Sequence, residues 1–127
     1  MEHLTEILLL LFLAITFLQS GWDKIVDWKG NLGWLQGHFS KTLFKDIVPL
    51  LLCVILVLES ISGVLAVFGV VQLVASDSNS FGFYAAVLSS ITLLFLLLGQ
   101  RIAKDYDGAR TIVIYFIPTV FLVFLMQ

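Results

Sequence analysis

The sequence predicts an all-α integral membrane protein, a four-helix bundle with a short amphipathic interfacial helix between spans one and two. The first observation behind this prediction is composition, because 60% of the 127 residues are hydrophobic and only 13% are charged, whereas about a quarter are charged in soluble domains. The second is the presence of four long apolar segments, which cover residues 4–26, 47–74, 81–98 and 109–126 approximately. We expect a single domain over residues 1–127.

The four apolar segments are expected to be helices. A helix needs about 20 residues to cross a hydrocarbon core of about 30 Å, and the last two segments fall slightly short of that length. The segments lack the alternating pattern of barrel strands, and an unpaired backbone is very unfavourable in lipid. The connections between them are a long one over 27–46, a tight serine-rich turn over 76–80, and a charged one over 100–110.

The first connection carries the predicted interfacial helix. Its apolar side chains recur at spacings of three and four residues, which is typical of an amphipathic helix at the headgroup level. These side chains are Leu32, Leu35, Phe39 and Leu43. The three tryptophans of the chain lie in or beside the same segment, at Trp22, Trp28 and Trp34. We expect them to form an interfacial aromatic belt.

The basic residues predict the orientation of the bundle. All seven lie in the first and third connections or at the helix ends beside them, namely Lys24, Lys29, Lys41, Lys45, Arg101, Lys104 and Arg110. Basic residues are concentrated in cytoplasmic loops, so both connections are expected to face the cytoplasm and both termini the opposite side.

The second apolar segment contains a carboxylate, Glu59. A helix over 47–74 would reach roughly 42 Å, so Glu59 lies far from either end. Ionisable groups at this depth need a partner, a neutral state or a function. Counting along the helix places small residues on the same stripe as Glu59, namely Ser62, Gly63, Ala66 and Gly69. Because small residues let helices approach closely, we expect Glu59 to face protein and this helix to pair with the third segment, which carries Ala86.

Counting helical rises from each turn places Glu59 and Tyr115 in one layer, with Gln100 and Arg101 about one turn nearer the cytoplasm. Two interpretations of Glu59 remain open. In the structural one, its carboxyl is neutral, or is paired with Arg101 or Lys24, and holds the helices in register. In the functional one, Glu59 binds the headgroup of a quinone or another ligand, and Tyr115 donates a hydrogen bond to it.

Three segments resemble motifs of the DoxX family of membrane proteins. They are Phe17-Leu18-Gln19-Ser20-Gly21-Trp22-Asp23-Lys24, Leu58-Glu59-Ser60-Ile61-Ser62-Gly63, and Gly99-Gln100-Arg101-Ile102-Ala103-Lys104-Asp105-Tyr106. The pattern positions that match are Gly21, Lys24, Glu59, Gly63, Gln100 and Arg101. The resemblance implies a four-span protein of the bacterial inner membrane. In that membrane, the distribution of basic residues would place both termini on the periplasmic side. The family includes subunits linked to quinol oxidase, to thiosulfate:quinone oxidoreductase and to a membrane-associated oxidoreductase complex, and its distant relatives include a eukaryotic receptor-assembly chaperone.

The residues predict no catalytic set, no metal site and no intrinsic cofactor. The two histidines, His3 and His38, lie outside the spans, and the one cysteine, Cys53, is expected to pack inertly. The composition offers no long basic run for nucleic acid. The partners we expect are the lipid bilayer and other membrane chains or further copies of this one.

Three functions are open at this stage. The first is an accessory or structural subunit of a larger membrane assembly, with a link to quinone-dependent redox metabolism and without catalysis of its own. The alternatives are a small quinone-binding component that uses Glu59, and a small transporter or channel. Small-residue faces such as that of Gly21 favour the first.

Overall fold

The computed structural model describes residues 3–127, and within that range it contains five helices and no strand. The helices are α1 (Leu4–Val26), α2 (Trp28–His38), α3 (Val48–Ser76), α4 (Ser80–Ile102) and α5 (Tyr106–Met126). All except α2 are long and apolar enough to cross a membrane. The predicted all-α bundle of four membrane-spanning helices is therefore confirmed.

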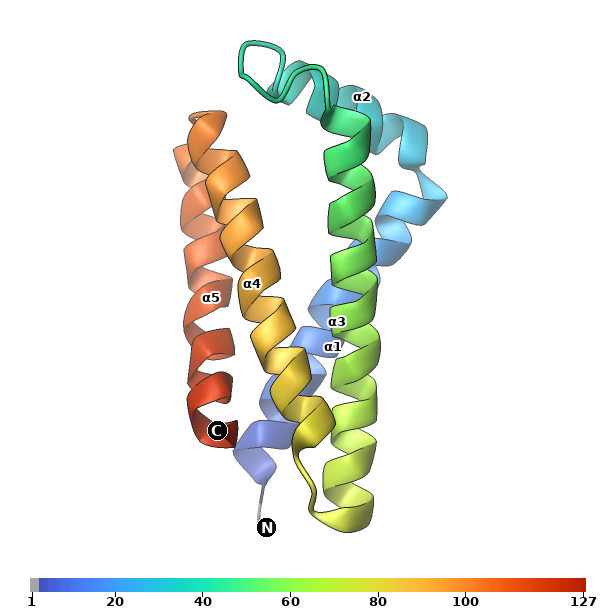
Figure 1. Cartoon of the computed structure of the whole chain (residues 1–127), viewed down its shortest axis with the longest axis vertical. Helices are drawn as coiled ribbons and strands as arrows, with labels where there is room; N and C mark the ends of the chain where they lie inside the picture. The colour runs from blue at the N-terminus through green and yellow to red at the C-terminus, as the bar shows by residue number, and fades with distance from the viewer. Residues whose placement is uncertain (1–2) are drawn as a thin grey trace.

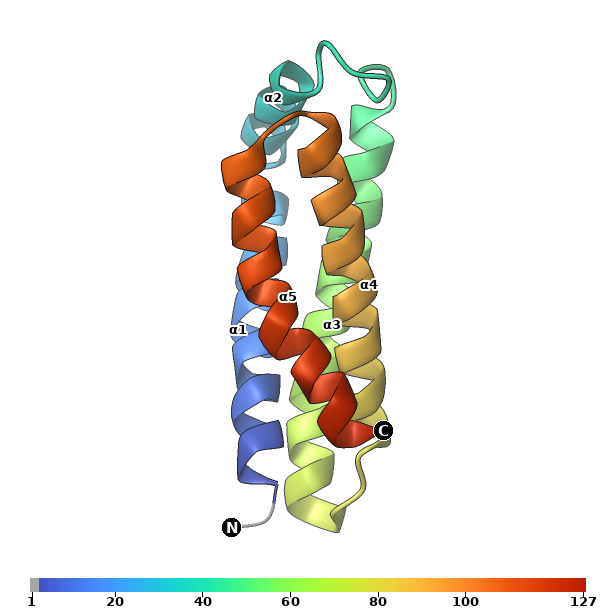
Figure 2. The ribbon, with the colours of Figure 1, turned by 90° about the vertical axis from the view of Figure 1, so that its left-hand side faces the viewer.

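The four long helices alternate in direction between the two ends of the bundle (Figure 1). The α3–α4 turn and the C-terminus lie at one end, and α2 lies across the other, over the α4–α5 turn. In Figure 2, α5 runs obliquely across the bundle, with α1 and α4 on either side of it. The buried core is built around Leu10, Leu13 and Phe17 of α1, together with Ala66 of α3 and Ala86 of α4.

The connection between α4 and α5 is shorter than expected. Helix α4 continues through Gln100 and Arg101, and α5 begins at Tyr106, so the connection predicted over 100–110 is only residues 103–105. Lys104 takes a left-handed conformation with φ 60°, and the Asp105 carboxylate accepts a hydrogen bond from the backbone N–H of Gly108 at 2.9 Å. The apolar pattern stops at the first polar side chains, but α4 and α5 extend beyond it. They can do so because charged side chains at helix ends reach the polar membrane surface.

The interfacial helix is also shorter than the apolar periodicity predicts. It begins after Asp27, whose carboxylate accepts from the backbone N–H of Gly30 at 3.2 Å, and it ends at His38. Phe39 and Leu43 therefore lie in the turns that follow and not on the helix. Phe39 is buried, whereas Leu43 is 79% exposed. The spacing of Phe39 and Leu43 after Leu35 predicts one continuous apolar face of a helix, but the helix ends before Phe39.

Small residues set the distance between the helices. A Cβ atom added to Gly63 would lie 2.7 Å from the Leu18 side chain of α1, and one added to Gly69 would lie 2.8 Å from the Cα of Gly82 on α4. All six positions predicted to pack helices are buried, namely Gly21, Ser62, Gly63, Ala66, Gly69 and Ala86. The small-residue faces are thus used within the chain, between α1, α3 and α4.

Candidate functional site

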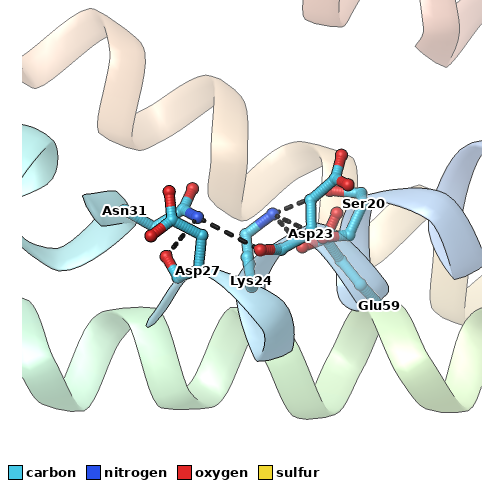
Figure 3. A network of polar contacts seen from close by, with 6 residues as sticks. All are labelled: Ser20, Asp23, Lys24, Asp27, Asn31 and Glu59. Atoms are coloured by element: carbon cyan, nitrogen blue, oxygen red, sulfur yellow. Dashed lines mark hydrogen bonds and ion pairs between the residues drawn. The ribbon is translucent and has the colours of Figure 1, made fainter. Parts of the chain in front are cut away.

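The most buried charge of the bundle forms an ion pair. Glu59 of α3 is 3% exposed, and its Oε1 lies 2.8 Å from Nζ of Lys24 on α1 (Figure 3). The contact is a charge contact and not an aligned hydrogen bond, since Oε1 lacks a partner in hydrogen-bond geometry. Lys24 donates hydrogen bonds to Oγ of Ser20, at 2.7 Å, and to the backbone oxygen of Ser20, at 3.5 Å.

The local structure of α1 explains why Lys24 reaches Glu59. Ser20 and Lys24 are four residues apart and therefore lie on one face of the helix. Side chains of a helix lean toward its N-terminus, so Lys24, near the C-terminal end of α1, leans into the membrane. Gly21 lies on the face that meets α3, where an added Cβ would be 3.1 Å from Oγ of Ser60. The close approach of the two helices brings the ammonium to the carboxylate.

A second set of polar contacts links α1 to α2. The Asn31 side-chain amide donates to the backbone oxygens of Asp23, at 3.3 Å, and Asp27, at 2.8 Å (Figure 3). Both oxygens also accept a backbone N–H, from Asp27 and from Asn31 respectively, each at 3.0 Å, so the Asn31 amide adds a second hydrogen bond to each. They hold the corner at which the chain turns from the membrane span into the interfacial helix, close to Lys24.

Two cavities lie on either side of the ion pair. The first, which we name the polar cleft, has a volume of about 350 Å³ and lies between α1, α4 and α5. Glu59 and Tyr115 line it, together with polar side chains of α1, namely Thr16, Gln19, Ser20 and Asp23. The cleft therefore gathers hydrogen-bonding groups at the depth of Glu59, inside the hydrophobic part of the bundle.

The second cavity, which we name the apolar chamber, has a volume of about 370 Å³. It lies between α3 and α4, beneath α2 and the connection that follows α2, and its walls are mostly apolar. Lys24 lines the chamber, whereas Glu59 lines the cleft. The two partners of the ion pair thus border different cavities, which also share the side chain of Leu96.

The structure brings together three of the five predicted polar site residues. Glu59, Lys24 and Tyr115 meet around the ion pair and the cleft, and Lys24 is the basic partner that the sequence left open. Gln100 lines the apolar chamber together with Lys24, whereas Arg101 lines neither cavity. Gln100 Oε1 is 2.9 Å from Nε2 of His38, and the Arg101 guanidinium lies 5.1 Å from the centre of the Tyr106 ring. The alternative pairing of Glu59 with Arg101 is therefore wrong.

Several polar residues of the site were missed from the sequence. Ser20 and Thr16 stand one and two turns before Lys24, so the four-residue spacing of polar groups within an apolar span could have revealed them. The contact of His38 with Gln100 joins residues 62 positions apart and gives no local signal. Cys53, which was expected to pack inertly, is exposed on the surface of α3.

The comparisons with known proteins add no relative. No family model, no curated protein and no solved structure matches the chain. Within residues 3–127, no three side chains of His, Cys, Asp or Glu lie close enough together to hold a metal ion.

Proposed function

We propose that this chain is a DoxX-like protein of the bacterial inner membrane that binds the headgroup of a quinone-class molecule in the polar cleft. One observation carries the proposal: Glu59 and Tyr115, from α3 and α5, line the same cleft. A quinone headgroup presents carbonyl oxygens, which accept hydrogen bonds, and its quinol form presents hydroxyl groups, which donate them. The Tyr115 hydroxyl and the Glu59 carboxylate supply one donor and one acceptor for these groups.

The surroundings of the cleft suit such a ligand. Ile15 of α1 lines the cleft and is 66% exposed on the membrane-facing surface, so an isoprenoid tail can leave the cleft toward lipid. The protein acts in this proposal by binding, and no bond-making step is assigned to it. Its cationic end, which includes α2, faces the cytoplasm, and its termini face the periplasm.

The accessory-subunit hypothesis loses one of the features that favoured it, the small-residue faces. Gly21 packs against α3, Gly63 against α1 and Gly69 against α4, all within the same chain. Quinone binding and membership of a larger assembly are compatible, because the ligand would occupy the interior and leave the outer surface free.

Quinone binding is tested with the protein purified from its native membrane in mild detergent. Extraction with hexane followed by chromatography measures bound quinone, and titration of the delipidated protein with decylubiquinone, followed by tryptophan fluorescence, measures the affinity. We expect Glu59→Gln and Tyr115→Phe each to weaken binding roughly fivefold, since a net hydrogen bond contributes about 1 kcal/mol.

Two matched control variants each remove one carboxylate or one hydroxyl at a position outside the polar cleft. Asp46→Asn lies in the connection before α3, and Tyr84→Phe lies on an exposed face of α4, so both should bind decylubiquinone as the unaltered protein does. Tyr115→Phe is the more telling variant, because the Tyr115 hydroxyl makes no hydrogen bond with any residue in 3–127 and its removal should leave the fold intact. Absence of extracted quinone, with equal affinity for all five proteins, would reject the proposal.

A further inference from the structure

The two cavities beside the ion pair differ in charge. Among the described residues, the lining of the apolar chamber includes one basic side chain, Lys24, and no acidic one. The lining of the polar cleft includes two acidic side chains, Asp23 and Glu59, and no basic one. In a low-dielectric interior such an asymmetry favours opposite kinds of ligand. The apolar chamber is suited to an anionic group.

The apolar chamber opens toward lipid. Val54 of α3 and Phe95 and Leu98 of α4 line it, and all three are also exposed on the outer, membrane-facing surface. Figure 1 shows α3 and α4 diverging toward the end that carries α2, where the chamber lies. A hydrocarbon chain can therefore extend from the chamber into the bilayer between these helices.

The interfacial segment closes the chamber on the headgroup side. Trp34 of α2 and Phe39 and Phe44 of the following turns line it. This roof is attached to α4 through His38, which contacts Gln100 at 2.9 Å and stacks on Trp34 with ring centres 4.6 Å apart. The chamber is thus bounded by aromatic rings above and mostly aliphatic side chains around it, with Lys24, Asn31 and Gln100 as its polar side chains.

The third hydrogen bond of the Lys24 ammonium is a long one that a better acceptor could replace. An ammonium has three N–H donors. Ser20 Oγ at 2.7 Å and Glu59 Oε1 at 2.8 Å engage it closely, whereas the next acceptor, the backbone oxygen of Ser20, lies at 3.5 Å. An anionic oxygen that entered from the chamber could take the third position and form a charge-assisted hydrogen bond.

We propose that the apolar chamber binds a single-chain amphiphile with an anionic head, a carboxylate or a phosphate, drawn from the membrane. The head contacts Lys24, and the chain lies in the chamber and continues into lipid between α3 and α4. This site is separate from the polar cleft, so the proposal stands independently of quinone binding.

The test follows quenching of Trp34, which lines the chamber, by a brominated amphiphile. Trp22→Phe and Trp28→Phe leave Trp34 as the only tryptophan, and neither replaced residue lines either cavity. In nanodiscs of neutral lipid, a dodecanoic acid brominated at mid-chain is compared with the alcohol of the same chain. We expect saturable quenching by the acid, with roughly tenfold higher affinity than for the alcohol, because only the acid gains the contact with the Lys24 ammonium.

Three further variants locate the site. The double variant Lys24→Met with Glu59→Gln removes both charges without leaving a buried unpaired one, and it should bind acid and alcohol equally. Gly99→Leu places a side chain into the chamber, where an added Cβ makes only an ordinary 3.5 Å contact with Phe39, and it should weaken both ligands. Gly33→Leu, at a position of α2 with open space around it, should weaken neither.

The outcomes separate the sources of the anion and decide the proposal. Displacement of the brominated acid by dodecyl phosphate assigns the site to both head types, and displacement by dodecanoic acid alone assigns it to carboxylates. The proposal is overturned by equal affinity for acid and alcohol in the Trp34-only protein, by a preference for acid that survives in the double variant, or by quenching that never saturates.

Discussion

At the scale of single residues, the central feature is a buried charge pair whose two members have different surroundings. Glu59 is 3% exposed, and its side chain has Lys24 as its only ionic partner within residues 3–127. Lys24 is less buried, with 17% of its side chain exposed, and Ser20 also binds it. Removal of one partner should therefore have unequal effects. A buried charge left without its partner is strongly destabilising, whereas replacement of the whole pair can be nearly neutral.

We predict that Lys24→Met destabilises the bundle by about 3 kcal/mol or more, the amount typical of a broken buried pair. Glu59→Gln should have a smaller effect, because Lys24 retains Ser20 and can extend toward water. The double variant should approach the unaltered protein. Thermal unfolding in mild detergent, followed by helical circular dichroism, measures the three. Additive losses in the double variant would show that the pair does not act as a unit.

At the scale of helices, backbone contact between α3 and α4 limits which residues can occupy their interface. A Cβ at Gly69 would lie 2.8 Å from Cα and 2.9 Å from N of Gly82, and backbone atoms cannot move aside independently. A Cβ at Gly82 instead meets the terminal methyl and sulfur of Met126, at 2.6 and 3.0 Å. The thioether chain of Met126 is flexible and can rotate away.

Gly69→Ala is accordingly predicted to destabilise the protein by about 1 to 3 kcal/mol, the range for overpacking of a close interface. Gly82→Ala should have less effect. Gly33→Ala, which meets nothing within 4 Å, should be neutral or stabilising by about 0.5 to 1 kcal/mol, since alanine favours a helix over glycine. The same unfolding assay ranks the three, and a loss at Gly82 as large as that at Gly69 would contradict the role assigned to the backbone contact.

At the scale of the whole molecule, the two ends differ in charge. The α2 end includes the connection with Lys41 and Lys45 and the turn with Lys104, whereas the opposite end includes Asp77 and the C-terminus. Because positive connections are retained on the cytoplasmic side, the α2 end is predicted to face the cytoplasm.

Cysteine labelling in intact cells tests this orientation. Cys53→Ser removes the only cysteine, and single cysteines are then introduced at Ser78, in the α3–α4 turn, and at Lys41, near α2. We expect a membrane-impermeant maleimide to label the cysteine at position 78 from outside and to label that at position 41 only after the membrane is opened. The reverse pattern would invert the bundle in the membrane.

The sequence by itself determined the number of spans, their helical nature and the end at which the basic residues gather. These properties follow from local composition, because each apolar run must satisfy its own backbone hydrogen bonds in lipid. It also placed Glu59 and Tyr115 in one layer, since helical rise is regular. The tertiary structure decided that Lys24, and not Arg101, meets Glu59, that Gln100 binds His38, and that two cavities border the ion pair. Those contacts depend on how the helices rotate and cross, and they need positions correct to within about 3 Å, the reach of a hydrogen bond. A count of residues along the chain is uncertain by about one helical turn, which is 5.4 Å.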